Sequence, residues 1–148
     1  MKVILASDHG GYKLADEIEA FLKDEGIEVN NIGCGSSDSC DYSDYGIPAA
    51  ERVASGEYDR GIVICGTGIG MSISANKVKG IRCALTHDCY TARVTREHND
   101  SNVLALGERV IGVDLAKEIV KIWIGGEFEG GRHERRINKL ADYEQKNG

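Results

Sequence analysis

Short apolar runs alternate with stretches of helical periodicity along the whole sequence. The first run, 2–6, is rich in β-branched residues and precedes a helical pattern that Gly26 terminates. The run 61–65 is the most apolar, as expected of a strand that is buried on both faces of a sheet. Repeated strand–helix units of this length predict an α/β fold in which helices cover both faces of a parallel sheet.

The same periodicity gives approximate bounds for each element. Strands are expected at 2–6, 27–32, 61–65, 81–86 and 102–106. After the helix that precedes Gly26, further helices are expected at 45–54, 71–78, 90–98, 115–124 and 132–145. The only proline, Pro48, is expected near the start of the second helix, where proline is tolerated. A TIM barrel needs roughly 250 residues, so a chain of 148 residues excludes it.

Length and charge narrow the class of protein. A chain of 148 residues suits one domain, and 41% apolar with 28% charged residues is ordinary for a soluble globular protein. No stretch reaches the ~20 apolar residues of a membrane helix, and an acid follows the first apolar run too early for a signal peptide. A cytoplasmic location is therefore expected. The net charge of −6 argues against binding to nucleic acid or to an acidic membrane.

The chain has five cysteines. An odd number without a secretory signal indicates reduced thiols rather than a disulfide framework, and the lack of a CxxC pair argues against a zinc ribbon. Only Cys65 is singled out by its position. The other cysteines and one histidine are expected to be structural: Cys34, Cys40, Cys83, Cys89 and His87.

In an open parallel sheet, ligands bind beyond the carboxyl ends of the strands, and Cys65 lies at such an end. The glycine-rich turn 66–70 follows it and opens a helix, so its N–H groups can converge on an anion and would stabilise the Cys65 thiolate. The GxGxG spacing is not the GxGxxG of a dinucleotide site, and no Walker lysine follows. The alternatives are a structural connector and a small buried core thiol.

Two histidines each allow two interpretations. Asp8 and His9 follow the first strand, and they either belong to a ligand site or form a helix N-cap beside a solvated histidine. His98 and Asn99 fall where the fourth helix stops, and they either take part in chemistry or cap that helix.

Three arginines crowd the start of the last helix, although cations are mildly disfavoured there. Arg132 and Arg136 are four residues apart and share one face with room to grip a phosphate together, with Arg135 between them. The alternative is a surface of ion pairs with neighbouring glutamates. These are Glu127, Glu129 and Glu134.

Five motifs occur in order along the chain: Ser7–Gly11, Asp41–Tyr42, Ile64–Gly70, Glu97–Asp100 and Glu129–His133. Together they resemble the type B ribose-5-phosphate isomerases, in a family that also holds galactose-6-phosphate isomerase subunits and an allose-6-phosphate isomerase. The resemblance implies a Rossmann-like three-layer α/β/α sandwich with a five-stranded parallel sheet. It also implies homodimers, some of which pair into tetramers, with active sites at the subunit interface and no metal or other cofactor.

The resemblance implies a role for each matching residue. Cys65 would be the general base that moves a proton between C1 and C2 through a cis-enediolate, and Thr67 with the N–H groups of 66–70 would stabilise the enediolate oxygens. His98 of the second subunit would help to open the furanose ring, with Asp8 assisting. The residues expected to bind the substrate or its phosphate are His9, Tyr42, Gly66, Gly68, Ile69, Gly70, Asn99, Arg109, Arg132 and Arg136.

The activity that follows from the resemblance is interconversion of ribose 5-phosphate and ribulose 5-phosphate, a step of the pentose phosphate pathway. A sugar phosphate of six carbons (allose or galactose 6-phosphate) or of four (a tetrulose phosphate) would suit the same chemistry, because sequence does not give the length of a pocket. A flavodoxin-like module that binds a nucleotide or flavin without catalysis would leave Cys65 without a role, and the missing GxGxxG counts against it. A redox sensor would use Cys65 as a reactive thiol without a sugar substrate.

Overall fold

A five-stranded parallel sheet forms the centre of the structure, a computed structural model that describes residues 1–147. The strands are β1 (Lys2–Ser7), β2 (Glu28–Asn31), β3 (Arg60–Cys65), β4 (Cys83–Leu85) and β5 (Val103–Gly107). They lie in the order β2-β1-β3-β5-β4, and every neighbouring pair is parallel. The predicted number of strands and their direction are therefore confirmed.

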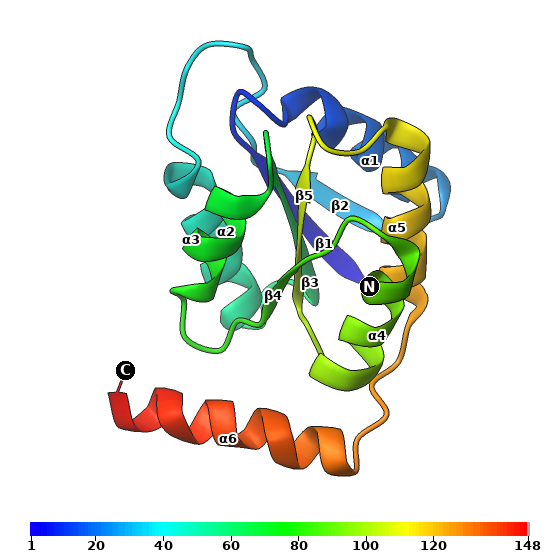
Figure 1. Ribbon diagram of the computed structural model, residues 1–148. Coiled ribbons are helices and arrows are strands. Elements are labelled where there is room, and N and C mark those ends of the chain that lie inside the picture. Colours follow the sequence, from blue (N-terminus) through cyan, green and yellow to red (C-terminus); the bar gives the residue numbers. More distant parts are fainter. Residues whose placement is uncertain (148) are drawn as a thin grey trace.

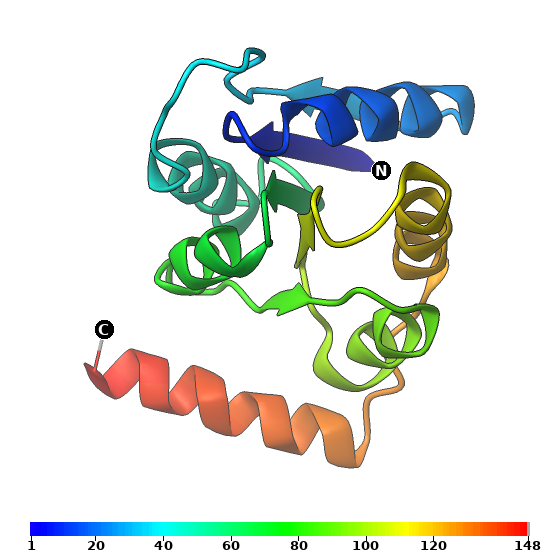
Figure 2. The ribbon, with the colours of Figure 1, turned by 45° about the horizontal axis from the view of Figure 1, so that its top comes forward.

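Helices cover both faces of the sheet, which confirms the predicted three layers (Figures 1 and 2). Their bounds are α1 (Tyr12–Asp24), α2 (Ser43–Ala54), α3 (Ile69–Asn76), α4 (Cys89–Asn99), α5 (Val113–Gly125) and α6 (Arg132–Asn147). One face carries α1, α4 and α5, and the other carries α2 and α3. α6 belongs to neither layer and lies at the foot of Figure 1, at the opposite end from the loop that joins β2 to α2.

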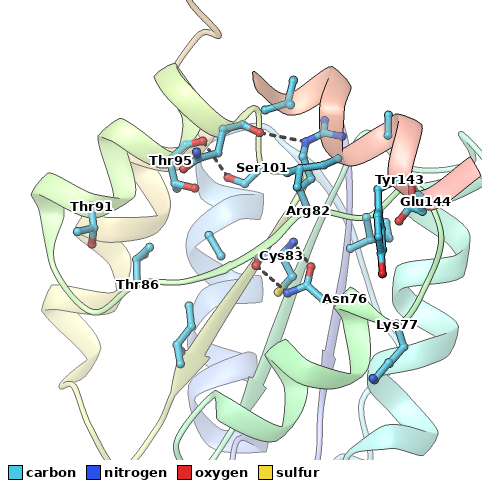
Figure 3. A pocket seen from close by; sticks show the side chains of 18 of the residues that line it. Asn76, Lys77, Arg82, Cys83, Thr86, Thr91, Thr95, Ser101, Tyr143 and Glu144 are labelled. Carbon is cyan, nitrogen blue, oxygen red and sulfur yellow. Dashed lines mark hydrogen bonds between the residues drawn. The ribbon is translucent and has the colours of Figure 1, made fainter. Parts of the chain in front are cut away.

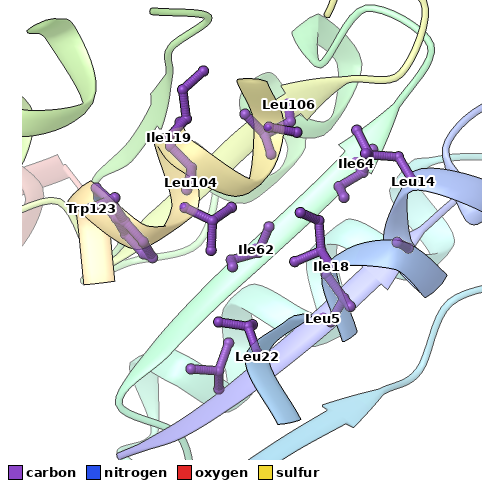
Figure 4. Close-up of a cluster of buried hydrophobic side chains, with 14 of the residues drawn as sticks. Leu5, Leu14, Ile18, Leu22, Ile62, Ile64, Leu104, Leu106, Ile119 and Trp123 are labelled. Atoms are coloured by element: carbon purple, nitrogen blue, oxygen red, sulfur yellow. The ribbon is translucent and has the colours of Figure 1, made fainter. Parts of the chain in front are cut away.

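Alternate residues of the central strands enter two separate cores. Leu5, Ile62 and Leu104 belong to the core beneath α1 and α5, which Trp123 completes (Figure 4). Neighbouring residues such as Val63 enter the second core, beneath α2 and α3. Because β1, β3 and β5 meet apolar side chains on both faces, their sequences are continuous apolar runs rather than alternating ones.

Three helices begin two residues earlier than the hydrophobic pattern predicted: α2, α3 and α5, the last at Val113 instead of residue 115. α2 begins at Ser43, since the carbonyl of Tyr42 already accepts the N–H of Gly46, and Pro48 therefore lies inside the helix rather than near its start. α3 begins at Ile69 instead of residue 71. Its N-cap, Gly68, has a φ of +79°, which turns the chain directly from the strand-end loop into the helix.

The fourth strand is shorter than predicted. It was expected at 81–86, but only Cys83–Leu85 pairs with β5. The N–H of Ile81 bonds to the carbonyl of Val78 in a turn, and the N–H of Arg82 bonds to the Asn102 side chain at 2.8 Å. These backbone groups are thereby withdrawn from the sheet, and β4 remains a short edge strand.

α6 makes few contacts with the rest of its own chain. Of its 16 residues only His133 is buried. Leu140 and Tyr143 are 62% and 69% exposed, although both are large apolar side chains. Exposed apolar side chains gathered on an unpacked helix are typical of a surface that meets another protein. Within residues 1–147, no helix combines the length and the hydropathy needed to traverse a bilayer.

Candidate active site

β1 and β3 lie side by side at the centre of the sheet, but the chain leaves them in opposite directions. The connection from β1 leads through α1 to β2 at one edge, whereas the connection from β3 leads through α3 to β4 at the other. Such a divergence opens a crevice beyond the carboxyl ends of the two strands, where ligands bind in open α/β sheets. Asp8 follows β1 and Cys65 ends β3, so both border this crevice.

The Cys65 thiol faces the backbone of the glycine-rich turn. Cys65 is only 5% exposed, and its sulfur accepts the N–H of Gly68 at 3.1 Å. A Cβ on Gly68 would lie 2.5 Å from Leu85 Cδ1 and 2.9 Å from the carbonyl carbon of Leu106. Glycine is therefore required here both for its positive φ and for the close approach of two strands. The turn is a rigid support for the sulfur.

Thr67 stands at the outer side of the same turn. It is exposed, and its Oγ1 accepts the N–H of Ile69 at 3.2 Å, which fixes the first residue of α3. The turn thus ends on a helix N-terminus, whose free N–H groups and dipole favour negative charge. An oxyanion that forms next to Cys65 would meet these groups.

The loop after β5 is hydrogen-bonded to the start of the glycine-rich turn. The N–H of Glu108 donates to the carbonyl of Cys65 at 2.9 Å, and the N–H of Arg109 donates to the carbonyl of Gly66 at 3.0 Å. The Arg109 guanidinium lies so close to Gly66 that a Cβ there would be 3.0 Å from its Nη1. A permanent cation therefore lies against the glycine-rich turn, on an exposed side chain that a ligand can reach.

Asp8 and His9 form the β1 side of the crevice. Asp8 is 6% exposed, and its Oδ1 accepts the N–H of Gly10 at 2.8 Å. The alternative of an N-cap is wrong, because the N-cap of α1 is Gly11 without a side-chain bond. His9 Nδ1 accepts the N–H of Cys40 at 3.2 Å, so the proton of the neutral ring is on Nε2, and among residues 1–147 no hydrogen bond uses that atom.

Tyr42 joins this group from the segment before α2. It is 44% exposed, and its ring lies against Gly70, where a Cβ would approach the ring to 2.7 Å. The strand-end group is defined here as the residues gathered around the crevice: Asp8, His9, Tyr42, Cys65, the turn 66–70 and Arg109. The structure brings all of them to one end of the sheet.

The other thiols are unlike Cys65 in their surroundings. Burial raises the pKa of Cys83 to about 12, and burial also raises the pKa of Cys89. The pKa of Cys40 is raised by burial and by the neighbouring Cys34. His87 accepts the N–H of Gly107 on Nε2 at 2.9 Å, and burial lowers its pKa, so it is a neutral support for the end of β5.

Four predicted site residues lie elsewhere. The helix-end group is defined as His98 and Asn99, at the end of α4, with Arg132 and Arg136, at the start of α6. α4 begins after the carboxyl end of β4 and runs back to the amino end of β5, so its last turn is at the opposite end of the sheet from Cys65. Within one chain, the structure does not bring the helix-end group to the strand-end group.

The end of α4 is held by buried polar contacts. Asp100 caps it with a left-handed φ of 47°, so the cap is Asp100 rather than the predicted Asn99. Arg96 donates to Asp100 Oδ1 at 2.9 Å and to the carbonyl of Ser101 at 2.6 Å. Trp123 Nε1 donates to Ser101 Oγ at 2.9 Å. The side chains of the last turn of α4 are therefore presented from a fixed backbone.

The arginines at the start of α6 are exposed. Within residues 1–147, the ion pairs include none made by Arg132, Arg135 or Arg136. The alternative interpretation, a surface of arginine–glutamate pairs, is therefore not what the described residues form. Both candidate phosphate ligands keep their donors available for an anion.

A stacked pair of imidazoles lies next to these arginines. The rings of His98 and His133 have centroids 4.1 Å apart and planes inclined by 7°. Glu129 Oε1 is 3.8 Å from His98 Nε2 and 3.5 Å from His133 Nε2. Glu129 and His133 were not predicted as functional, although a carboxylate and an imidazole four residues apart beside a helix end could have drawn attention to them.

The same three side chains have the residue types of a metal site. Their ligand atoms lie within 4.8 Å of one another, and two histidines with a carboxylate suit Zn²⁺. A metal ion lies close to the plane of each imidazole that binds it, however, and the two ring planes are nearly parallel. Both rings would have to turn before they could share an ion, so the arrangement is that of two interacting imidazoles.

Comparisons with known proteins agree with the fold. The Ribose/Galactose Isomerase family model matches residues 3–140. Ribose-5-phosphate isomerase B of Escherichia coli is 48% identical over 145 residues, which cover 98% of this chain and 97% of the relative. A D-erythrulose-4-phosphate isomerase of Pectobacterium atrosepticum is 39% identical over 145 residues, with coverage of 97% and 95%. The solved structure of Clostridium thermocellum ribose-5-phosphate isomerase B is 56% identical, has a TM-score of 0.98 and covers 100% of both chains. The chain therefore belongs to the ribose/galactose isomerase family.

Proposed function

We propose that this protein interconverts ribose 5-phosphate and ribulose 5-phosphate, with Cys65 as the general base. The observation that carries the proposal is the Cys65 sulfur at the end of β3, which accepts the N–H of Gly68 in a crevice lined by Asp8, His9 and Arg109. An aldose–ketose shift needs a base, donors for the enediolate oxygens and an anchor for the phosphate. The strand-end group supplies the first two and, in His9, part of the third.

In the proposed reaction, the Cys65 thiolate takes the proton from C2 of the open-chain aldose. The electron pair of the C–H bond forms the C1–C2 double bond, and the carbonyl oxygen at C1 gains the negative charge. Thr67 and the N–H groups of 66–70 stabilise this cis-enediolate. As the carbonyl at C2 forms, the O2 proton is transferred to O1 and Cys65 returns its proton to C1, so the isomerisation is balanced without a redox partner.

The remaining steps need the helix-end group. His98 moves a proton at the ring oxygen to open the furanose, with Asp8 assisting. Arg132, Arg136 and His9 grip the phosphate, and Asn99 contacts the sugar. Because the two groups lie at opposite ends of one chain, the site is complete only when a second copy brings its helix-end group over the strand-end group of the first. The working form is therefore a homodimer.

The surface next to α6 supports this assembly. A groove of about 1020 Å³ runs between α6 and the edge of the sheet (Figure 3). Leu85, Leu140 and Tyr143 contribute to its lining and are exposed. In Figure 3, Tyr143 and Glu144 of α6 lie across the groove from Asn76, the last residue of α3, and from Lys77, which follows it. A second copy that fills the groove would cover an open sheet edge and an unpacked helix together.

The substrate is the finer part of the proposal. Ribose 5-phosphate is favoured because similar proteins include the ribose-5-phosphate isomerases of Escherichia coli and Clostridium thermocellum, and because one chain here carries the cysteine, histidine and arginine set. A four-carbon substrate is the second candidate, because a relative of 39% identity is a D-erythrulose-4-phosphate isomerase. A cytoplasmic location and a role in the pentose phosphate pathway belong to the same proposal.

The direct test is turnover. Purified protein is incubated with ribose 5-phosphate in EDTA, and ribulose 5-phosphate is followed by NMR. Conversion that Cys65→Ala loses supports a metal-independent cysteine isomerase. No conversion of ribose 5-phosphate, together with fast conversion of D-erythrulose 4-phosphate, would transfer the assignment to the four-carbon substrate. Failure with both, and with six-carbon sugar phosphates, would contradict the proposed function.

A further inference from the structure

The segment that joins α5 to α6 holds the two stacked histidines next to each other. The N–H of Glu129 donates to the carbonyl of Glu97 at 3.0 Å, which ties this segment to the last turn of α4. Gly130 and Gly131 follow with φ of +71° and +57°, so the chain turns sharply and His133 enters the first turn of α6. The contact of His98 with His133 is therefore set by backbone geometry.

The two histidines differ in burial. His133 is 6% exposed, and its Nε2 has no hydrogen-bond partner within residues 1–147. The His98 side chain is 39% exposed, so one side of its ring is open to a ligand. The inner ring is the support and the outer ring is the one that can reach a substrate.

The charges around the stack favour a neutral His133. Burial lowers the pKa of His133, and the neighbouring His98, Arg132 and Arg136 lower it further, while Glu129 opposes them. The charged groups around the stack are Glu129, before α6, and Arg132 and Arg136, on α6. Burial and the neighbouring arginines disfavour the charged form of His133, so the inner ring of the stack is the neutral support.

We propose that His133 and Glu129 are positioning residues for His98 in ring opening. His133 fixes the plane of the His98 ring by stacking, and Glu129 supports the charged form that His98 passes through when it moves a proton. This inference rests on the proposed function, since it assigns the stack to one step of that reaction. It leaves the proton transfer by Cys65 untouched.

The two steps can be separated with the ketose. Ribulose 5-phosphate cannot close to a furanose, because its 5-hydroxyl carries the phosphate. Exchange of its C1 hydrogen with D₂O therefore requires Cys65 and the enediolate donors but no ring opening. Turnover of ribose 5-phosphate, which is supplied as a furanose, requires both steps. A positioning defect at His98 should slow the second reaction and spare the first.

The variants are His133→Ala, His133→Phe and Glu129→Gln, with Glu134→Gln, in the first turn of α6, as the control for loss of a nearby carboxylate. We expect His133→Ala and Glu129→Gln to lower kcat for ribose 5-phosphate at least about tenfold. Their rates of C1 exchange on ribulose 5-phosphate should stay within about twofold of wild type, since general-base chemistry at Cys65 is unchanged. His133→Phe keeps a stacked ring and should retain more activity than His133→Ala, and Glu134→Gln should match wild type in both assays.

Each outcome bears on a different claim. Unchanged turnover of ribose 5-phosphate in both His133→Ala and Glu129→Gln would overturn the positioning role. An equal fall in turnover and in exchange would also overturn it, because it would show general damage to the site. The isosteric Glu129→Gln keeps the test valid should His133→Ala fail to fold. Absence of both reactions in the wild-type protein would instead contradict the proposed function itself.

Discussion

The strand-end group and the helix-end group differ in what holds their functional side chains in place. Around Cys65 the walls are backbone: Gly68 and Gly66 are clamped against the strands and against the loop after β5. Around His98 the walls are side chains on the ends of two helices, and α6 is buried only at His133. Proton transfer needs a site with little freedom, which a backbone cage provides. A phosphate grip tolerates more freedom than proton transfer does, which suits the proposed delivery of the helix-end group by a second copy of the chain.

Cys65→Ala should give the largest effect. Loss of the base should lower kcat by at least about 10³-fold, near the upper range for general acid–base catalysis. Cys89→Ala is the matched control, because burial raises the pKa of that thiol and it lies outside the strand-end group. Steady-state kinetics with circular dichroism checks both variants. Comparable activity in the two would remove Cys65 from the mechanism.

Gly68→Ala tests the rigidity of the backbone cage. The new Cβ would be 2.9 Å from the Leu106 carbonyl carbon, and Gly68 has a φ of +79°. We expect kcat to fall about 100-fold, as for loss of one oxyanion donor. Gly56→Ala is the control, since its φ is +86° but nothing lies within 4 Å of its Cβ.

The pair of glycine variants separates strain from crowding. Gly56→Ala should lose only about 1–2 kcal/mol of unfolding free energy from the left-handed backbone, whereas Gly68→Ala should lose more. Urea unfolding measures both. Equal losses of unfolding free energy would mean that the strands around Gly68 move apart easily to admit a Cβ, and would contradict a rigid backbone cage.

Arg136→Ala tests the helix-end group. Removal of one phosphate ligand should raise KM for the sugar phosphate at least about tenfold, or about 1.4 kcal/mol, with a smaller change in kcat. Arg135→Ala, one position away on α6, should leave KM unchanged. Equal KM values in the two variants would return these arginines to a general surface role.

The smallest effect concerns His87, which supports the end of β5 from outside the site. Burial lowers its pKa below the ordinary 6.5, and its Nε2 must be unprotonated to accept the N–H of Gly107. The unfolded chain therefore binds more protons than the folded chain below about pH 6.5, so the stability contributed by the neutral ring is lost as pH falls. His87→Gln, which keeps an acceptor, should flatten the dependence of urea midpoints on pH between about 7.5 and 5.5. An unchanged slope would exclude His87 as its source.

The contrast also explains what sequence could predict. Continuous apolar runs such as 61–65 exist because strands are buried on both faces, so the sheet and the position of Cys65 follow from local pattern. The length of β4 could not be predicted in this way, because it depends on a hydrogen bond from the N–H of Arg82 to the side chain of Asn102. The stack of His98 on His133 could not be predicted either, since it joins two segments through a turn at Gly130 that the hydrophobic periodicity does not mark.

The most direct measurement of the central claim, that two copies share each site, is a mixed dimer. Cys65→Ala and His98→Asn chains are co-expressed with different affinity tags, and the mixed species is isolated by two successive affinity steps. Each variant alone should be inactive. The mixed dimer contains one site with both Cys65 and His98 intact and should recover about half of the wild-type activity per dimer. A mixed dimer as inactive as its parents would place Cys65 and His98 of one chain in the same site and contradict the account.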